Sequence, residues 1–232
     1  MGHRKIGLLG GTAPESTVSY YRYFTREYKR RFGDYGFPEI LIYSVNFQEL
    51  LELGHAGRWN RVADRAVEVF DALKRAGADF GLMTANTMHI VFNEVAQRTS
   101  LPLLSIVDAS VEAVAHEGID CVGLLGTVDT MKGSFYPDTL DKQRITTLVP
   151  DPDDQARLSR VIYDELALGE IRAESKRECL RVITGLQERG ARGILLACTE
   201  LPLLVRQDDV SLPLFDTMEI HADKALRLAT RA

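Results

Sequence analysis

Short apolar runs alternate with longer segments of helical periodicity along the whole chain. The runs that predict strands are Lys5–Leu9, Glu39–Ser44, Phe80–Thr84, Leu103–Ile106, Cys121–Leu125, Arg144–Val149, Gly193–Ala197 and Leu214–Phe215. Between them lie segments such as Arg58–Ala76, whose apolar residues recur at three- and four-residue steps before Gly77. Strands that alternate with helices in this way indicate βαβ units and a parallel sheet.

Three short motifs occur twice and in the same order. Ile6–Gly10 recurs as Val122–Gly126, Gly77-Ala78 as Gly190-Ala191, and Ser100–Leu103 as Ser211–Leu214. The offsets, 116, 113 and 111 residues, drift only slightly. This predicts an α/β protein of two pseudo-symmetric lobes, each a four-stranded, mainly parallel sheet flanked by helices. We place the N-terminal lobe at residues 1–112, the C-terminal lobe at 113–216, and a C-terminal helix at 217–232 that packs back on the N-terminal lobe.

Composition and charge indicate which kinds of partner the protein is expected to bind. The 232 residues carry 28 basic and 33 acidic side chains, a net charge of −5 without long runs of one sign, so neither nucleic acid nor an anionic membrane is expected. No apolar run approaches the ~18 residues that a membrane span needs. The first residues lack the order of a signal peptide. We therefore expect a cytoplasmic protein with a small-molecule partner.

Small hydroxyl, amide and glycine residues follow the predicted strands. The turns are Gly10–Thr17, Ser44–Asn46, Thr84–His89, Gly126–Thr130 and Ala197–Glu200. Open parallel sheets bind ligands at the carboxyl ends of their strands, and backbone N–H groups at helix starts hold anions. We therefore expect an anionic ligand in a cleft between the lobes. Gly10-Gly11-Thr12 lacks the spacing of a dinucleotide loop, and the chain has no ATP-binding phosphate loop.

The three cysteines have separate contexts. They show neither a CxxC pair nor metal-ligand spacing, so a disulfide framework and structural zinc are not expected. Cys121 begins a strand and Cys179 lies in the helical segment 172–187, and we interpret both as packing residues. Cys198 ends a strand before the polar pair Thr199-Glu200, where the start of a helix stabilises a thiolate. It is the candidate reactive thiol, and an inert buried cysteine is the alternative.

In the alignment of the two repeats, Ala85 occupies the position equivalent to Cys198, and Asn86 the position equivalent to Thr199. Two acid/base groups on opposite faces of a carbon acid would carry out two-base proton transfer, but here one of the two positions carries a methyl group. Thr84, one residue earlier, is the candidate replacement. Its alternative is a strand residue that points to the other face of the sheet.

These motifs together resemble the aspartate/glutamate racemase family of cofactor-independent amino-acid racemases. The resemblance rests on Gly10–Thr17, on Ala85–His89, on Ala197–Glu200, and on Phe215–Thr217 with His221. It implies two pseudo-symmetric lobes, an α-carboxylate held by loop amides and hydroxyls, and two residues that exchange the α-proton. It also implies that no pyridoxal phosphate or other cofactor and no metal takes part. A homodimer is expected.

The site predicted in this way has catalytic and substrate-binding members. Cys198 and Thr84 are the catalytic candidates. The substrate-binding candidates are Thr12, Asn46, Ala85, Asn86, Thr87, Thr127, Thr130, Thr199 and Glu200. For several of them capping a turn or helix is an equal alternative, and for Glu200 capping is favoured over orienting Cys198. We interpret His89 and His221 as structural histidines and Tyr163 as a packing aromatic.

The chain departs from the family pattern at Ala85. The family carries a thiol at this place, and a subgroup with the same Asn-Thr-Met-His loop carries threonine. Three functions follow. The first is racemisation of aspartate or glutamate with Cys198 as acid/base. The second is a one-thiol reaction of the decarboxylase or cis-trans isomerase type. The third is an amino-acid-binding protein without turnover.

Overall fold

The computed structural model describes residues 2–231, and the chain divides into two compact units. Unit 1 comprises Met1–Ile106 and His221–Ala232, and unit 2 comprises Val107–Ile220. Each unit contains a four-stranded sheet whose pairings are parallel. The predicted α/β class with two similar sheets is therefore confirmed.

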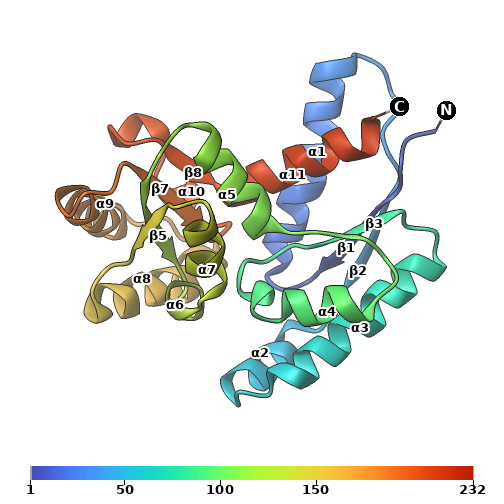
Figure 1. Ribbon diagram of the computed structural model, residues 1–232, viewed down its shortest axis with the longest axis horizontal. Helices are drawn as coiled ribbons and strands as arrows, with labels where there is room; N and C mark the ends of the chain where they lie inside the picture. Colours follow the sequence, from blue (N-terminus) through green and yellow to red (C-terminus); the bar gives the residue numbers. More distant parts are fainter. Residues whose placement is uncertain (1, 232) are drawn as a thin grey trace. The chain divides into compact units, whose positions relative to one another are not determined.

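Unit 1 has the strand order β2-β1-β3-β4 (Figure 1). Its strands are β1 (Ile6–Gly10), β2 (Ile40–Ser44), β3 (Phe80–Met83) and β4 (Leu103–Leu104). Its helices are α1 (Pro14–Phe32), α2 (Phe47–His55), α3 (Trp59–Arg75), the 3₁₀ helix η1 (Thr87–Val91), α4 (Phe92–Arg98) and most of α11 (Thr217–Thr230).

Unit 2 repeats this order as β6-β5-β7-β8. Its strands are β5 (Cys121–Gly126), β6 (Thr146–Leu148), β7 (Gly193–Ala197) and β8 (Leu214–Asp216). Its helices are α5 (Ile106–His116), α6 (Val128–Lys132), α7 (Phe135–Lys142), α8 (Pro152–Asp164), α9 (Ala173–Glu188) and α10 (Leu201–Leu204), with the short 3₁₀ helices η2 (Leu166–Leu168) and η3 (Gln207–Asp209).

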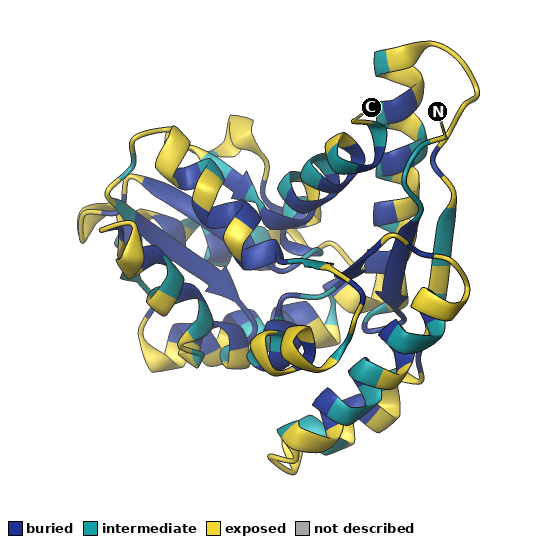
Figure 2. Cartoon of the chain, turned by 45° about the vertical axis from the view of Figure 1, so that its right-hand side comes forward, coloured by how far each residue is buried: buried dark blue, intermediate teal, exposed yellow. Residues whose placement is uncertain are grey.

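The central strands of both sheets are buried on both faces, which explains their unbroken apolar runs (Figure 2). In unit 1, Leu9 and Met83 pack with the apolar side of α3. In unit 2, Ile194 and Leu196 pack with α8 and α9. A glycine in each first strand permits this close packing: a Cβ on Gly7 would lie 3.1 Å from the Ala78 Cβ, and one on Gly123 would lie 2.7 Å from Ile194. The repeated Gly in the sequence motif thus leaves room for neighbouring residues in both units.

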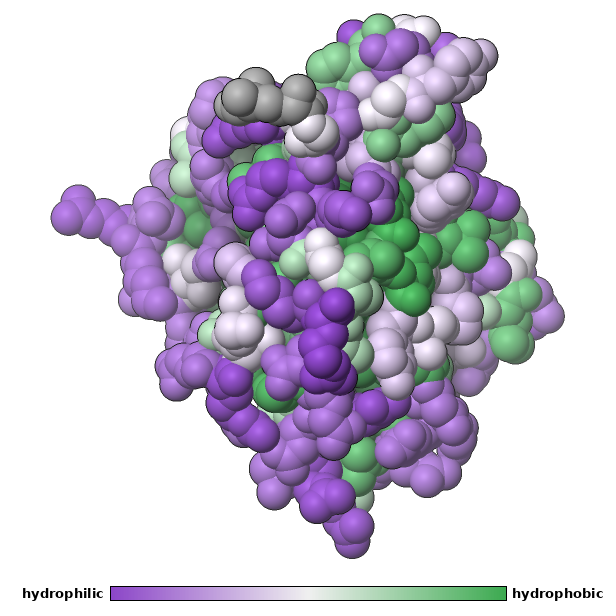
Figure 3. Space-filling model, turned by 90° about the vertical axis from the view of Figure 1, so that its right-hand side faces the viewer, coloured by the Kyte–Doolittle hydropathy of each residue, from purple (hydrophilic) through white to green (hydrophobic). Residues whose placement is uncertain are grey.

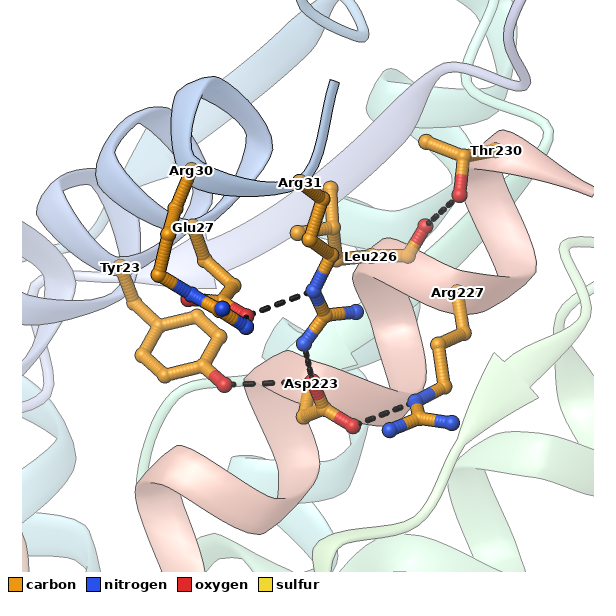
Figure 4. A network of polar contacts seen from close by, with 8 residues as sticks. All are labelled: Tyr23, Glu27, Arg30, Arg31, Asp223, Leu226, Arg227 and Thr230. Atoms are coloured by element: carbon orange, nitrogen blue, oxygen red, sulfur yellow. Dashed lines mark hydrogen bonds and ion pairs between the residues drawn. The ribbon is translucent and has the colours of Figure 1, made fainter. Parts of the chain in front are cut away.

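The last helix of the chain packs against the first helix (Figure 4). Asp223 of α11 accepts hydrogen bonds from Arg31 and Tyr23 of α1 and from Arg227, one turn further along α11. Glu27 binds the other side of Arg31 at 2.6 Å. This ion network joins the C-terminal residues to unit 1.

Two residues that the sequence pattern assigned to strands lie outside strands in the structure. Ile106 begins α5 and does not end a strand, and Arg144 lies in a turn before β6, with a left-handed φ of 59° that a strand excludes. The chain passes between the units at 106/107 and 220/221, inside α5 and α11.

Among the described residues, no helix combines the length and the apolar character needed to cross a membrane.

Candidate active site

A tight glycine loop follows β1. Gly11 has φ 85°, and a Cβ there would lie 2.5 Å from the Val45 carbonyl oxygen, so only glycine fits. Ala13 has the strained values φ 77° and ψ 98° just before α1. Thr12 between them is 4 % exposed, and its Oγ1 has no hydrogen-bond partner among the described residues. The loop therefore contains a buried hydroxyl that no described residue satisfies, which is uncommon in folded proteins.

Thr84 lies directly after β3 and is 0 % exposed. Its hydroxyl donates to the Leu9 carbonyl oxygen at 3.1 Å, and the Thr17 hydroxyl lies 3.4 Å away. Thr17 in turn accepts a hydrogen bond from Gly11 N at 3.0 Å. These contacts tie the glycine loop to the end of β3. They give Thr84 a structural role, and its predicted role as an acid/base group stays a prediction.

His89 fixes the loop that carries Ala85, Asn86 and Thr87. Its Nδ1 lies 3.1 Å from the Ala85 carbonyl oxygen, and its Nε2 accepts a hydrogen bond from Ile106 N at 3.1 Å. The imidazole is therefore neutral, with its proton on Nδ1. Burial lowers the pKa of His89 to about 4. The structural interpretation of His89 is confirmed, while Ala85 and Thr87 stay partly accessible and Asn86 is buried.

His221 of α11 also connects two elements through its two ring nitrogens. Tyr20 Oη lies 2.8 Å from Nδ1, and the Leu104 carbonyl oxygen lies 3.0 Å from Nε2. Burial, with a smaller contribution from His89, lowers the pKa of His221 to about 3. Tyr20 was missed by the sequence analysis, although a signal existed. It lies at the repeat offset from Tyr136, a second buried tyrosine, which hydrogen-bonds with Ser110 and Thr217 in unit 2.

Cys198 lies at the carboxyl end of β7 and is 7 % exposed. Its Sγ donates a hydrogen bond to Glu200 Oε2 at 3.0 Å. Thr199 Oγ1 donates to the same carboxylate oxygen at 2.7 Å. The prediction that Glu200 caps its helix is wrong, because its side chain makes no capping bond to the short helix α10 and faces the thiol instead.

The electrostatics of Cys198 differ from the expected thiolate. Burial, and next the neighbouring Glu200 carboxylate, raise the pKa of the thiol well above its usual value. The backbone N–H groups of Glu200 and Leu201 oppose this shift but contribute less. The four-residue helix α10 thus supplies too little stabilisation of negative charge to outweigh burial, and the resting group is a protonated thiol.

Tyr163 was interpreted as a packing aromatic, but it is exposed and hydrogen-bonds with the Thr127 side chain. Burial of part of the ring, then the charges of Asp129, Cys198 and Glu200, raise the pKa of its phenol to about 12. Tyr163 also lines an apolar hollow of about 520 Å³ with Val128 and Arg160. No periodicity or motif marked this residue, because its partners come from other segments of unit 2.

The other candidates have local roles in the fold. Asn46 caps α2 by accepting from Gln48 N at 3.1 Å, and Thr127 caps α6 by accepting from Thr130 N at 3.4 Å. Thr130 is fully buried. Cys179 lies in the apolar core of unit 2, where burial raises its pKa to about 12, so its assignment to packing is confirmed. Cys121 is partly exposed at the start of β5.

Strand pairing extends the repeat of the first strands to the two loops. Met83 pairs with Leu9 of β1, and Leu196 pairs with Leu125, the repeat counterpart of Leu9, in β5. The second residue after Met83 is Ala85, and the second after Leu196 is Cys198. The two units therefore present a methyl group and a thiol at equivalent positions.

Comparisons with known proteins agree with this geometry. Residues 9–225 match the family model described as Asp/Glu/Hydantoin racemase. A putative Asp/Glu racemase from Yersinia pestis is 39% identical with a TM-score of 0.92, covering 98% of this chain and 100% of the other. An aspartate racemase homologue from Pyrococcus horikoshii is 38% identical with a TM-score of 0.83 and the same coverage.

A third relative carries the name of an enzymatic activity. A broad specificity amino-acid racemase of Bacillus subtilis is 29% identical over 140 residues, which are 58% of this chain and 60% of that protein. The family match spans most of the chain and confirms the resemblance drawn from the loop motifs. The chain belongs to the Asp/Glu/Hydantoin racemase family.

Proposed function

We propose that the chain is a cofactor-independent racemase of a small acidic amino acid, aspartate or glutamate, with Cys198 as an acid/base at Cα. Family membership supports amino-acid racemase chemistry. The observation that carries the assignment to Cys198 is its buried thiol at the end of β7, hydrogen-bonded to the buried Glu200. A positioned thiol of this kind suits proton transfer to and from carbon.

The proposed reaction moves one proton at a time. In the donor direction, the Cys198 S–H bond breaks, a C–H bond forms at the planar carbanion, and the thiolate keeps the electron pair of the broken bond. In the reverse direction, the thiolate takes the α-proton and the substrate keeps the electron pair. Because an α-amino-acid proton is only weakly acidic, each transfer needs a correctly placed group, which contributes about 10²–10⁴-fold in rate.

The loop after β1 is proposed to bind a polar group of the substrate. Its support is the unpartnered Thr12 hydroxyl, which a ligand oxygen would satisfy, and the strained Ala13 beside the N-terminus of α1. Asn86, Thr87 and Thr199 are proposed as further contacts, because they follow β3 and β7 at the same edge of their sheets.

Chiral chromatography of both enantiomers of aspartate and glutamate tests this function. We expect Cys198→Ala to lower interconversion by at least about 10²-fold, because the variant lacks the group that transfers the proton. Cys121→Ser is the matched control, since Cys121 begins β5 at the opposite end of the sheet from the proposed site. Equal activity of Cys198→Ala and the unaltered chain would refute the assignment.

A one-sided proton transfer is the second candidate. It is favoured by Ala85, which stands at the position equivalent to Cys198, and by Thr84, whose hydroxyl is bonded to the Leu9 carbonyl. A chain of this kind would exchange the α-proton of one enantiomer with solvent and retain its configuration. Product stereochemistry therefore distinguishes it from racemisation.

We also propose that the chain forms a homodimer. Figure 3 shows apolar side chains gathered among hydrophilic ones on the face it presents. The edge strand β2 exposes Ile42, and α1 exposes Val18 and Tyr21. Edge strands and exposed apolar residues favour association between chains. Sedimentation of the chain as a monomer at micromolar concentration would contradict this proposal.

A further inference from the structure

The carboxylate of Glu200 has an unusual setting for a charged group. Glu200 is 6 % exposed, and its Oε2 accepts hydrogen bonds from two uncharged donors, the Cys198 thiol at 3.0 Å and the Thr199 hydroxyl at 2.7 Å. Buried carboxylates are normally stabilised by hydrogen bonds to the charged form. Here part of that stabilisation comes from the thiol proton, so the carboxylate and the proton on sulfur depend on each other.

The local chain geometry explains why the two groups meet. Glu200 is two residues after Cys198, at the N-cap position of α10, with φ −90° and ψ −22°. Asp, Asn, Ser or Thr at this position commonly bonds to the first free N–H groups of its helix. Glu200 makes no such bond, and Leu201 N donates to the Cys198 carbonyl oxygen at 3.2 Å. The carboxylate is thus directed to the S–H group.

The other groups near the sulfur do not favour a thiolate. Burial raises the pKa of the Tyr163 phenol in α8, and the charges of Asp129 and Glu200 act on that phenol in the same direction. Cys198 belongs to an apolar cluster that also contains Leu125, Leu201 and Leu204. A thiolate here would lie in apolar surroundings beside a carboxylate, which raises its free energy relative to the thiol.

We propose that Glu200 is a positioning residue that holds Cys198 as an oriented, protonated thiol, so that the resting protein presents a proton donor at this position. Its catalytic meaning rests on the proposed function of Cys198. Before the thiol gives its proton to a carbanion, the S–H bond turns from Oε2 toward the carbon, and the 3.0 Å hydrogen bond to Oε2 is lost. The S–H bond then breaks, a C–H bond forms, and the thiolate that keeps the electron pair lies beside a negative carboxylate. Return of a proton to sulfur is therefore favoured, and abstraction from substrate is the harder direction.

The pH dependence of alkylation tests this inference without any substrate. Iodoacetamide reacts with the thiolate, so the rate at Cys198 measured peptide by peptide in the mass spectrometer reports its titration midpoint. Cys121 in the same samples is the internal reference, because it is partly exposed. We expect Glu200→Gln to lower the midpoint of Cys198. Below the midpoint, each unit of decrease raises the alkylation rate tenfold.

A second variant is expected to act in the opposite direction. Thr199→Val removes a donor from Oε2 but keeps the carboxylate, which should then hold the thiol proton more strongly and raise the midpoint. Looser packing would admit water to the sulfur and lower the midpoint in either variant, because burial is the largest cause of the raised pKa. Midpoints that move in opposite directions in the two variants therefore distinguish the role of Glu200 from a packing effect. An unchanged or raised midpoint in Glu200→Gln would overturn the inference. If that variant does not fold, an unchanged or lowered midpoint in Thr199→Val would overturn it.

The alkylation test of Glu200 and the activity test of Cys198→Ala can fail independently of each other. If Glu200→Gln leaves the midpoint unchanged while Cys198→Ala lacks racemase activity, only the role of Glu200 is refuted. If the midpoint moves as expected while Cys198→Ala stays fully active, Glu200 still holds the thiol proton, but that thiol is not the catalytic acid/base.

Discussion

At the residue scale, Ala85 and Cys198 are the pair that most affects the mechanism. They stand two residues beyond equivalent strand pairings, yet one has a methyl group and the other a thiol. Thr84, the residue before Ala85, donates its hydroxyl proton to the Leu9 carbonyl oxygen. The chemistry of the two units is therefore unequal.

Ala85→Cys is expected to increase the interconversion of enantiomers. Ala85 is partly accessible, so a thiol at this position would supply a second acid/base group without displacing a buried residue. The expected gain is about 10²-fold or more, followed by chiral chromatography from each enantiomer.

Ala85→Ser is the control for that substitution, because it adds a polar atom of similar size with a far less acidic proton. Equal rates for Ala85→Cys and the unaltered chain, with both folded, would contradict the equivalence of Ala85 and Cys198.

At the element scale, two buried histidines join the loop after β3 and helix α11 to the ends of other elements. His89 connects the Ala85 carbonyl to the first residue of α5, and His221 connects Tyr20 of α1 to Leu104 of β4. Both are neutral, and each uses one ring nitrogen as donor and the other as acceptor. Protonation would place a buried positive charge on each ring, and at His89 it would turn the acceptor of the Ile106 N–H bond into a second donor.

Acid is therefore expected to destabilise the fold well before it protonates most carboxylates. Burial lowers the pKa of His89 to about 4 and that of His221 to about 3. Between these values and about 6.5, the unfolded chain binds protons that the folded chain excludes, so the free energy of unfolding falls as pH falls. For His89 alone the loss is about 3 kcal/mol over this range.

Urea unfolding between pH 7.5 and 4.5 measures this dependence. His89→Gln should show a smaller slope with pH, because glutamine does not titrate but still offers an acceptor to Ile106 N. His116→Gln is the matched control and should keep the original slope, since the His116 side chain is 87% exposed. A free energy of unfolding that is constant over this pH range would contradict the neutral, buried state of both histidines.

At the scale of the whole molecule, the alternation of strands and helices and the repeat were readable from the sequence. Glycines spaced alike in β1 and β5 and the buried apolar runs of the central strands are local signals. All eight strands overlap the apolar runs that predicted them. The predicted positions of the strand ends were less accurate than the predicted strands themselves. Arg144 adopts a left-handed conformation that its residue type does not announce, and Ile106 is as apolar at the start of a helix as in a strand.

The candidate site was predictable only in part, because side-chain partners are set by the fold. Cys198 was found from its place after a strand. The direction of the Glu200 carboxylate, two residues on, depends on the turn into α10. Tyr163 reaches Thr127 from a helix more than thirty residues away, and no local pattern records that contact. The missing partner of the Thr12 hydroxyl likewise becomes visible only in the folded chain.

Exchange of the α-hydrogen in D₂O tests the central claim most directly, because it detects proton transfer whether or not the product is inverted. Each enantiomer of aspartate and glutamate is incubated with the unaltered chain and with Cys198→Ala, and the Cα–H signal is followed by NMR. We expect at least one enantiomer to lose this signal with the unaltered chain and to keep it with Cys198→Ala. Full retention of the signal for all four amino acids, or equal loss with both proteins, would contradict the account.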